Sequence, residues 1–391
     1  MTGAMTGGMT GPFPRAEHER RARALQAGMG ARGIDALLLS QPADIFWLTG
    51  FLTRFWESPA RPFFTLLPAA GAPIAVIPSI GAALMGATWV EDIRTWPAPV
   101  PEDEGVSLLA DAVREIVPEA GCLALPLGPE TATRIPGRDL SKLSDAVAPR
   151  RIVDGTTTLH RAREVKSEAE IARIRAACAA AGRAFDRLGE IAAAGAPLDA
   201  VFRAFQRLAL EEGADWVGYL AGGAGPGGYA DVISPATAAP LAPGDLLMLD
   251  LGAVIGGYWS DYDRNYAISA PTAEAERAHA ILYEATEAGI AAARPGSTAE
   301  MVHTAIARAI TAAGGQPLDG RLGHGLGLTL TEWPSIMPGD TTELREGMVL
   351  TIEPGLEIAP GRIQVHEEVI VLRENGAELL SPRAPAVLPV L

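Results

Sequence analysis

The sequence predicts an α+β protein with two domains, an α/β domain at the N-terminus and a C-terminal domain of two α-α-β-β halves that face each other. The chain has 391 residues, which is long for a single hydrophobic core. Strand and helix patterns alternate up to about residue 155, which is typical of an α/β domain. Beyond that point a pair of helical stretches precedes a pair of strands, and this order then occurs a second time.

The N-terminal α/β domain is expected to span residues 14–158. Its first helix starts near Pro14, where apolar residues recur with helical spacing, and it stops at Gly33. Short apolar runs predict buried strands at 34–40, 63–68 and 73–79. Two more helices are predicted at 42–51 and 107–121. Residues 1–13 are rich in glycine and threonine and lack the pattern of a signal peptide, so we expect a disordered tail.

The C-terminal domain is expected to span residues 159–391. Ser167 and Glu170 have capping-box spacing, which marks the start of a long amphipathic helix. In the first half, helices are expected at 167–193 and 198–213, and a pair of strands at 246–268. In the second half, helices are expected at 272–293 and 298–314, and strands at 347–353 and 363–372. Residues 221–245 are rich in glycine and proline and are predicted to be irregular.

Charge and cysteine content narrow the classes of partner and compartment. The net charge of −15 and the lack of a basic run argue against a nucleic-acid partner and against binding to an anionic membrane. The acidic balance is explained by solubility, and a preference for cationic substrates is the alternative. Cys122 and Cys178 are far apart in the sequence, so we expect two buried free thiols in a reducing compartment, the cytoplasm. No apolar run is long enough to span a bilayer.

Three carboxylates interrupt Leu249–Asn265, a stretch that otherwise has the pattern of a buried β-hairpin. A two-residue turn at Gly256–Gly257 places Asp250 directly opposite Asp263. Asp261 is two residues from Asp263, so all three carboxylates point to one face of the hairpin. Three like charges on a half-buried face are destabilising unless protons or cations compensate them, or unless that face is open to water.

Three further residues could complete a metal site with these carboxylates. His324 lies between glycines in GHGLG, Glu353 ends an apolar strand, and Glu367 lies in the predicted strand GRIQVHEEVIVL. Each of them alone is more typical of a structural residue. Together with Asp250 and Asp261 they supply four carboxylates and one imidazole. This donor set suits two divalent cations, with manganese as the first expectation and iron, zinc or cobalt as alternatives.

The ordered series Asp250, Asp261, His324, Glu353 and Glu367 resembles the metal site of the pita-bread metallopeptidases, the family of methionine aminopeptidase, aminopeptidase P and prolidase. The surrounding segments GDLLMLDLG, SDYDR, GHGLGL, LTIEPGL and EEVIVLRENGAELLS resemble that family as well. EVKSEAEIARIRAA is similar to the start of the catalytic domain in aminopeptidase P and prolidase. GIDALLLSQPADIFWLTGF is similar to the N-terminal domain that these enzymes share with creatinase, so the resemblance covers nearly the whole chain after residue 14.

The resemblance implies a creatinase-like N-terminal domain, a C-terminal pita-bread fold around a curved antiparallel sheet, and a homodimer. It implies that Asp250, Asp261 and Glu367 bind or bridge two metal ions, and that His324 and Glu353 complete the second metal. Two bound metals lower the pKa of a bridging water and polarise the scissile carbonyl. Glu353 is then the catalytic group that holds and transfers the proton of that water. The implied activity is dinuclear, metal-dependent hydrolysis of an amide bond, as in prolidase.

Two histidines that contact the substrate in the peptidases of this family are absent. The first falls in the region of Val232–Ile233, and the second falls after His324, at the position of Thr331. The metal ligands are therefore retained, whereas the groups that handle the peptide are replaced. Thr331 is a candidate for substrate binding.

Two more residues are candidates for substrate binding. Asp263 stands where the family has threonine, and it could be an extra ligand, an acceptor behind the ligands, an anchor for a cationic substrate group or a salt-bridge partner of Arg264. Arg54 lies in the loop FLTRFWESPARPFF, which could line the pocket of a neighbouring subunit, with a packing or interface loop as the alternative.

These observations leave several functions open. The first is a hydrolase for a small substrate, with Xaa-Pro dipeptides as the family default. The second is a specialised enzyme for a metabolite that is not a peptide, either a hydrolase of a small amide or betaine or a metal-dependent lyase. A binding module that has lost catalysis is disfavoured, because such a protein has no reason to keep clustered carboxylates together.

Overall fold

The computed structural model describes residues 12–58 and 61–391. The chain forms two compact units, one that ends at Arg163 and one that runs from Glu164 to Leu391. The boundary lies slightly beyond the predicted one, because helix α6 (Thr156–Arg163) is part of the N-terminal unit. Most of the predicted tail lies outside the described residues. Phe13, its last residue, is buried, with the guanidinium of Arg21 4.4 Å from its ring centroid.

The N-terminal unit contains one mixed six-stranded sheet in the order β4-β3-β2-β1-β5-β6. Its strands are β1 (Ala36–Leu39), β2 (Phe64–Pro68), β3 (Ile74–Pro78), β4 (Asp92–Trp96), β5 (Cys122–Leu125) and β6 (Arg151–Asp154). β1 pairs antiparallel with β2 and parallel with β5, and the other parallel pairs are β3–β4 and β5–β6. This arrangement confirms the predicted α/β domain.

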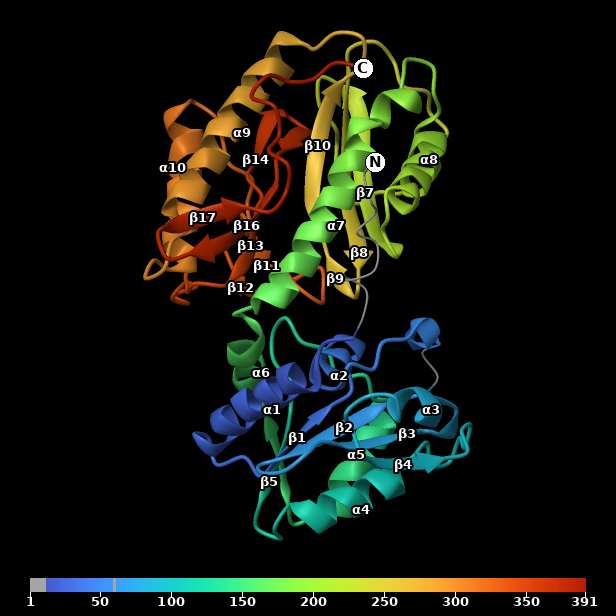
Figure 1. Cartoon of the computed structure of the whole chain (residues 1–391). Helices are drawn as coiled ribbons and strands as arrows, with labels where there is room; N and C mark the ends of the chain where they lie inside the picture. The colour runs from blue at the N-terminus through green and yellow to red at the C-terminus, as the bar shows by residue number, and fades with distance from the viewer. Residues whose placement is uncertain (1–11, 59–60) are drawn as a thin grey trace, which may run out of the picture. The chain divides into compact units, whose positions relative to one another are not determined.

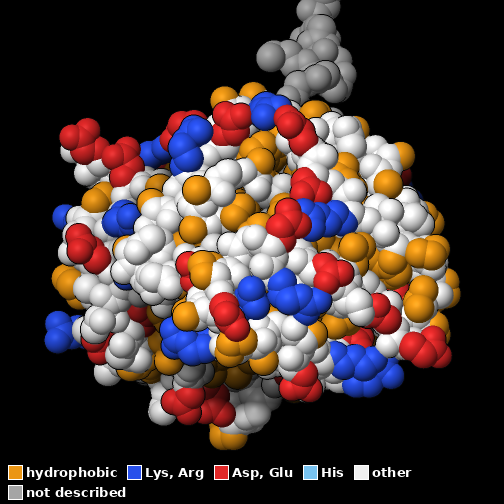
Figure 2. Space-filling view, turned by 90° about the horizontal axis from the view of Figure 1, so that it is seen from below, with side chains coloured by type: hydrophobic (Ala, Val, Ile, Leu, Met, Phe, Trp, Pro, Cys, Tyr) orange, Lys and Arg blue, Asp and Glu red, His pale blue; other side chains and the backbone are white. Residues whose placement is uncertain are grey.

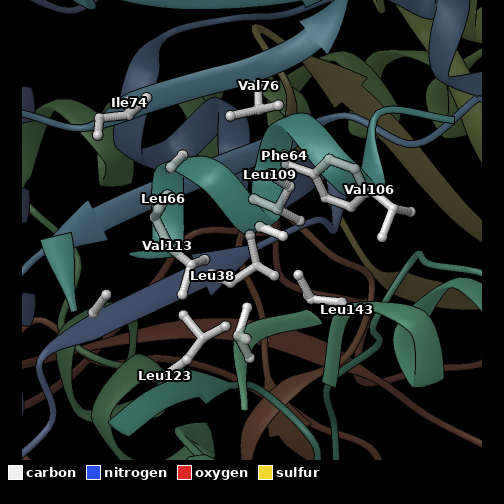
Figure 3. Packing of buried hydrophobic residues seen from close by; sticks show 14 of the residues in the cluster. Leu38, Phe64, Leu66, Ile74, Val76, Val106, Leu109, Val113, Leu123 and Leu143 are labelled. Carbon is white, nitrogen blue, oxygen red and sulfur yellow. The ribbon is translucent and has the colours of Figure 1, made fainter. Parts of the chain in front are cut away.

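Helices cover this sheet and close its core. They are α1 (Arg15–Gly30), α2 (Pro42–Thr49), α3 (Ala82–Met85), α4 (Val106–Ile116) and α5 (Gly137–Val147), together with α6 and two short 3-10 helices, η1 (Arg54–Glu57) and η2 (Ser79–Gly81). Figure 3 shows side chains of β1, β2, β3 and β5 pointing toward those of α4 and toward Leu143 of α5. Burying an aliphatic or aromatic side chain of this kind contributes about 1.5–3 kcal/mol, so these contacts are a large favourable term for the N-terminal unit.

The first half of the C-terminal unit is an antiparallel sheet with two helices beside it. β7 (Trp216–Pro226), β8 (Asp245–Ile255) and β10 (Tyr262–Ala267) lie in the order β10-β8-β7, and β9 (Tyr258–Trp259) pairs with the end of β8. α7 (Glu168–Asp186) and α8 (Leu198–Glu211) lie along this sheet (Figure 1). A short 3-10 helix, η3 (Leu188–Glu190), follows α7, which begins with the predicted capping box.

The second half repeats this plan. α9 (Ala273–Ala292) and α10 (Ala299–Ala312) lie beside a five-stranded antiparallel sheet in the order β12-β11-β13-β16-β17 (Figure 1). Its strands are β11 (His324–Gly325), β12 (Glu332–Ser335), β13 (Val349–Ile352), β16 (Glu368–Arg373) and β17 (Gly376–Leu379), and a separate ribbon pairs β14 (Gly355–Ala359) with β15 (Arg362–Val365). The two α-α-β-β halves confirm the predicted architecture.

Two predictions about the C-terminal strands were wrong in detail. The stretch 221–245 is not wholly irregular, because Ala221 to Pro226 belong to β7 and pair with β8. Glycine occurs in this strand where the backbones approach closely: a Cβ on Gly222 would lie 2.1 Å from the carbonyl oxygen of Met248. The predicted strand 363–372 is divided into β15 and β16, and Glu367 lies at the break between them.

The surface carries charges of both signs. On the face shown in Figure 2, the lysine and arginine side chains that the structure describes lie among acidic and apolar ones. Within the described parts of the chain, none of the helices combines the length and the apolar character needed to cross a membrane. Both cysteines, Cys122 and Cys178, are buried and unpaired.

Candidate metal centre

The hairpin formed by β8, β9 and β10 presents three aspartates on one face. Ile255 pairs with Tyr258 across the turn, and Asp250 pairs with Asp263, so the register predicted from the glycine turn is confirmed. The intervening Tyr262 points to the opposite face, where its hydroxyl donates a hydrogen bond to the carbonyl of Cys178 in α7 at 2.8 Å. The alternation of the strand therefore directs the carboxylates away from the helix layer.

The second half supplies three more groups from neighbouring strands. His324 begins β11, Glu353 directly follows β13, and Glu367 directly precedes β16. These three strands are adjacent in the order β11-β13-β16, so the three residues meet at one edge of the sheet. Ligand atoms of Asp261, His324 and Glu367 all lie within 4.8 Å of one another, which brings the first half of the unit into the same cluster.

His324 is oriented with one ring nitrogen toward the carboxylates. Its Nδ1 lies 2.9 Å from the carbonyl oxygen of Gly325, and because a carbonyl only accepts, Nδ1 carries the hydrogen. Nε2 therefore presents its lone pair, at 3.4 Å from Oδ2 of Asp261 and 3.8 Å from Oε2 of Glu353. A lone pair facing two carboxylate oxygens is repulsive, unless a proton or a cation lies between them.

Burial dominates the electrostatics of the cluster. It raises the pKa of both Asp250 and Glu353 to about 7, with Glu353 adding to the effect at Asp250. The pKa values of Asp261 and Glu367 are also raised well above their ordinary range, by burial first and then by neighbouring carboxylates. Burial also lowers the pKa of His324 to about 4, so the imidazole is neutral at physiological pH, as a metal ligand must be.

The residues present fit a divalent metal centre. Within the cluster, three buried carboxylate oxygens have no hydrogen-bond partner among the residues that the structure describes, namely Oδ1 of Asp250, Oδ1 of Asp263 and Oε1 of Glu367. Buried acceptors are rarely left unpaired in proteins, since each one costs about 1–3 kcal/mol. Oxygen atoms from several carboxylates and one neutral imidazole are a donor set that divalent cations such as Mn²⁺, Fe²⁺, Zn²⁺ or Co²⁺ accept.

A glycine directly before His324 positions its backbone. Gly323 has φ of +147°, and a Cβ at this residue would lie 2.3 Å from the carbonyl oxygen of Thr351. Gly323→Ala is therefore expected to destabilise the C-terminal unit by about 1–3 kcal/mol and to weaken metal binding, because β11 must move away from β13. Thermal unfolding and metal titration of the variant test this expectation.

Gly320 offers a matched control for that substitution. It also has a positive φ, of +107°, but a Cβ at this residue would meet nothing within 4 Å. Gly320→Ala should therefore show only the backbone strain and no specific loss of metal affinity. Equal effects of both substitutions on metal affinity would contradict the steric role of Gly323.

Arg264 ties the two halves together beside the cluster. Its Nη1 donates to the carbonyl oxygens of Asp263 at 2.6 Å and Glu367 at 2.9 Å, which belong to opposite halves. Its Nη2 lies 3.0 Å from Oε2 of Glu368, a fully buried carboxylate, and it also donates to the carbonyl of Pro382. The guanidinium thus sets the spacing of the two strands that carry the aspartates and Glu367.

Removing Arg264 is expected to be strongly destabilising. Arg264→Met leaves the carboxylate of Glu368 buried with only part of the positive charge that neutralises it. This should lower the free energy of unfolding by about 3–5 kcal/mol. Urea unfolding measures the loss. Arg175→Met is the control, because the ion pair of Arg175 with Glu378 is half exposed and is expected to contribute at most about 1 kcal/mol. A loss below 1 kcal/mol for Arg264→Met would contradict the role assigned to it.

Two residues near the cluster were missed by sequence reasoning. Arg321 places Nε 3.6 Å from Oε1 of Glu353 and donates from Nη2 to Oγ1 of Thr331 at 3.2 Å, so it connects Thr331 to the centre. Tyr219 lies on β7, and its pKa is raised by burial and then by Asp250 and the other carboxylates. Tyr219 was missed because no strand was predicted over Trp216–Pro226, and Arg321 lies in a loop without a diagnostic pattern.

His366, which directly precedes Glu367, and the candidate Arg54 have partners of their own. His366 points to α9, where its Nδ1 donates to Oγ1 of Thr286 at 2.9 Å, since the Thr286 hydroxyl donates to the carbonyl of Leu282. Arg54 belongs to the N-terminal unit, where it forms an exposed ion pair with Glu57 at 3.0 Å. Its role in substrate binding stays a prediction.

Comparisons with known families agree with the resemblance noted in the sequence. Residues 172–374 match the model of metallopeptidase family M24, and residues 21–165 match the creatinase/prolidase N-terminal domain. The matched segments contain all five residues of the ordered carboxylate and histidine series.

Similar proteins include curated relatives and solved structures. A probable dipeptidase PepE of Mycobacterium tuberculosis is 29% identical over 383 residues, which cover 97% of this chain and 98% of the relative. An Xaa-Pro dipeptidase of Lactobacillus delbrueckii is 28% identical over 90% of this chain and 94% of the relative. The crystal structure of dipeptidase PepE from Mycobacterium ulcerans is 30% identical, with a TM-score of 0.84 over 97% of this chain and 99% of that one. The prolidase of Pyrococcus horikoshii, at 23% identity and a TM-score of 0.81 over 94% of this chain and 100% of that one, shares the fold.

Proposed function

The chain belongs to metallopeptidase family M24 and is a metallohydrolase, and from this premise we propose that it hydrolyses the amide bond of dipeptides with two divalent metal ions per chain. The observation that carries the proposal is the buried cluster in which the lone pair of His324 faces Asp261 and Glu353. Relatives that align over nearly their whole length are named dipeptidases, one of them an Xaa-Pro dipeptidase, which supports a dipeptide substrate.

The metal ligands in this proposal are Asp250, Asp261, His324, Glu353 and Glu367. Manganese is the proposed metal, because four of the five ligands are carboxylates, and iron, zinc or cobalt would be accepted by the same donors. Cations held by these residues would polarise the scissile carbonyl and lower the pKa of the attacking water. The neutral imidazole of His324 needs no proton loss to take part.

Glu353 is the proposed proton carrier. It is the most open of the residues that contact His324, with a side chain 25% exposed against 5% for Asp261. It can therefore reach both the attacking water and the leaving nitrogen. Glu353 takes the proton from the water and returns it to the amine of the departing residue, which is general base and then general acid catalysis.

Thr331 and Arg321 are the proposed substrate contacts within this unit. The hydrogen bond between them and the approach of Arg321 to Glu353 place a cationic group beside the scissile bond. In the absence of the two family histidines, a guanidinium at this place can hold the carboxylate of a dipeptide. Arg54 and Asp263 remain further proposals for substrate contact.

The changed substrate-handling groups also favour a second candidate, a specialised enzyme for a small metabolite on the same scaffold. Threonine in place of histidine at position 331 leaves a hydroxyl where the peptidases of the family have an imidazole. A hydrolase of a charged small amide or betaine, or a metal-dependent lyase, would use the same metal centre. We place the protein in the cytoplasm, since both of its thiols are free, and we propose a homodimer as its assembly.

Metal content and substrate turnover test the proposal together. The purified protein is reconstituted with Mn²⁺ and assayed with Xaa-Pro dipeptides, dipeptides without proline, tripeptides and N-acetylated dipeptides. Two metals per chain with cleavage confined to dipeptides would support the proposal. Two metals without any peptide turnover would transfer support to the small-metabolite enzyme, where products distinguish a hydrolase from a lyase, which forms an alkene and consumes no water. Absence of bound metal would refute both.

A further inference from the structure

Asp263 lies on the metal face, and its carboxylate forms no salt bridge with the lysine and arginine side chains that the structure describes. It is directly opposite Asp250 in the β8–β10 pair, and side chains in such pairs have Cβ atoms about 4.5–5.5 Å apart. Its side chain is buried, with the residue only 2% exposed. The neighbouring Arg264 donates to the carbonyl oxygen of Asp263, while its guanidinium forms an ion pair with Glu368 instead.

The orientation of the Asp263 carboxylate is fixed through one oxygen. Oδ2 accepts a hydrogen bond from Nδ2 of Asn265 at 2.7 Å. Asn265 is itself held by the carbonyl of Val365 at 2.8 Å and by the hydroxyl of Tyr229 at 3.1 Å. The other oxygen, Oδ1, is buried and has no hydrogen-bond partner.

Two other carboxylate oxygens of the cluster are also buried without a hydrogen-bond partner among the described residues. They are Oδ1 of Asp250 and Oε1 of Glu367. The three residues come from β8, from β10 and from the residue before β16, so three independent backbone segments each present an unsatisfied acceptor. None of the three is a donor when ionised, so the acceptors cannot satisfy one another.

We propose that Asp263 is a metal ligand, whose Oδ1 joins Asp250 and Glu367 in an all-carboxylate position for a hard cation such as Mn²⁺. This inference rests on the proposed two-metal function. The two metal positions then have different ligands. The position with Asp263 has carboxylates only, whereas the other position includes the nitrogen donor of His324. Carboxylate oxygen ligands favour Mn²⁺ or Mg²⁺, whereas an imidazole ligand also suits Zn²⁺ and Fe²⁺. Asp263 would then select the metal at one position, where a threonine would contribute only a neutral hydroxyl.

Isothermal titration of the metal-free full chain with Mn²⁺ and with Zn²⁺ tests this role. In Asp263→Asn and Asp263→Thr, Mn²⁺ affinity at one of two positions is expected to fall by at least about tenfold, with the second position changed by less than about threefold. The loss should be larger for Mn²⁺ than for Zn²⁺. The metal-free variants should also unfold at a higher temperature than the metal-free wild type, because one buried like charge is removed.

Asp245→Asn is the matched control. Asp245 is a buried carboxylate on the opposite face of β8, where its Oδ2 accepts from the backbone amide of Ala242 at 2.8 Å. The Asp245→Asn variant should be less stable than the wild type, with unchanged metal affinity.

Each result has a defined meaning. Wild-type protein that binds fewer than two metals would overturn the proposed function itself. Wild-type protein that binds two metals, with unchanged affinities in Asp263→Asn, would overturn the present inference alone and would indicate a protonated Asp263 that donates to Asp250. Simultaneous loss of both positions in the asparagine variant would also overturn it, because a ligand of one position cannot abolish both.

Discussion

Replacing Glu353 with glutamine is expected to lower kcat by about 10²–10⁴-fold at saturating metal. The amide keeps the size of the side chain and one oxygen that can still coordinate, but it cannot accept the proton of the attacking water. The number of metals bound at saturation should therefore stay the same while turnover collapses. Steady-state kinetics with the best dipeptide of the panel, together with metal titration, measure both quantities.

Glu357→Gln is a suitable control for this substitution. Glu357 lies on β14, a few residues beyond Glu353, and is exposed. The same chemical change there should leave kcat within about twofold, as expected of surface substitutions. A Glu353→Gln enzyme with more than about a tenth of wild-type kcat would show that another group carries the proton.

Metal removal is expected to destabilise the protein by about 4 kcal/mol for each metal lost, relative to protein at a metal concentration about 1,000 times the Kd, which is about 8–16 °C in Tm per metal. The reason is that metal-free protein buries several carboxylates whose mutual repulsion the cations otherwise neutralise. Calorimetry before and after chelation, and again after Mn²⁺ is restored, measures the difference.

This difference should grow with pH. The pKa values of Asp250 and Glu353 are about 7 in the folded protein, above their ordinary values for an unfolded chain. Groups with a raised folded pKa contribute stability that is fully present below their ordinary pKa of about 4 and is lost as the pH rises from there to about 7. Cations, by contrast, bind the ionised carboxylates and are displaced by protons as the pH falls. The Tm gain from Mn²⁺ is therefore expected to be small near pH 5.5 and largest near pH 8.

A double substitution provides the control for the pH effect. Asp250→Asn combined with Glu353→Gln removes both groups whose pKa is about 7, so the Tm of the metal-free protein should fall less steeply between about pH 4 and pH 7. An unchanged fall in the double variant would assign the pH dependence to other groups. A Tm gain from Mn²⁺ that does not depend on pH in the wild type would contradict the raised pKa values.

Local rules were sufficient for much of the site. The glycine turn and the twofold alternation of strands predicted that Asp250 faces Asp263, and the structure confirms this pair. The capping box at Ser167 was equally local, since it involves groups within one helical turn. The order of the five candidate ligands along the chain was enough to indicate the family, because each lies in a short and distinctive segment.

Other features depend on contacts between distant segments. The glycines of β7 have the composition of a loop, yet they form a strand because the backbone of β8 approaches too closely for a side chain at Gly222. The break between β15 and β16 at Glu367 could not be found, because no glycine, proline or other turn residue marks it within 363–372. Arg321 and Tyr219 became candidates only when folding placed them beside Glu353 and Asp250.

The amino-acid sequence specified which chemical groups are available and how neighbouring ones are directed, because turn geometry and side-chain alternation act over a few residues. Packing of the two half-sheets specified that Asp261, His324 and Glu367 meet within 4.8 Å. It also made Arg264 the tie between the halves, through carbonyls about a hundred residues apart in the chain. Burial then shifted the pKa values of the carboxylates and the imidazole, and burial is a property of the assembled core that no local pattern contains.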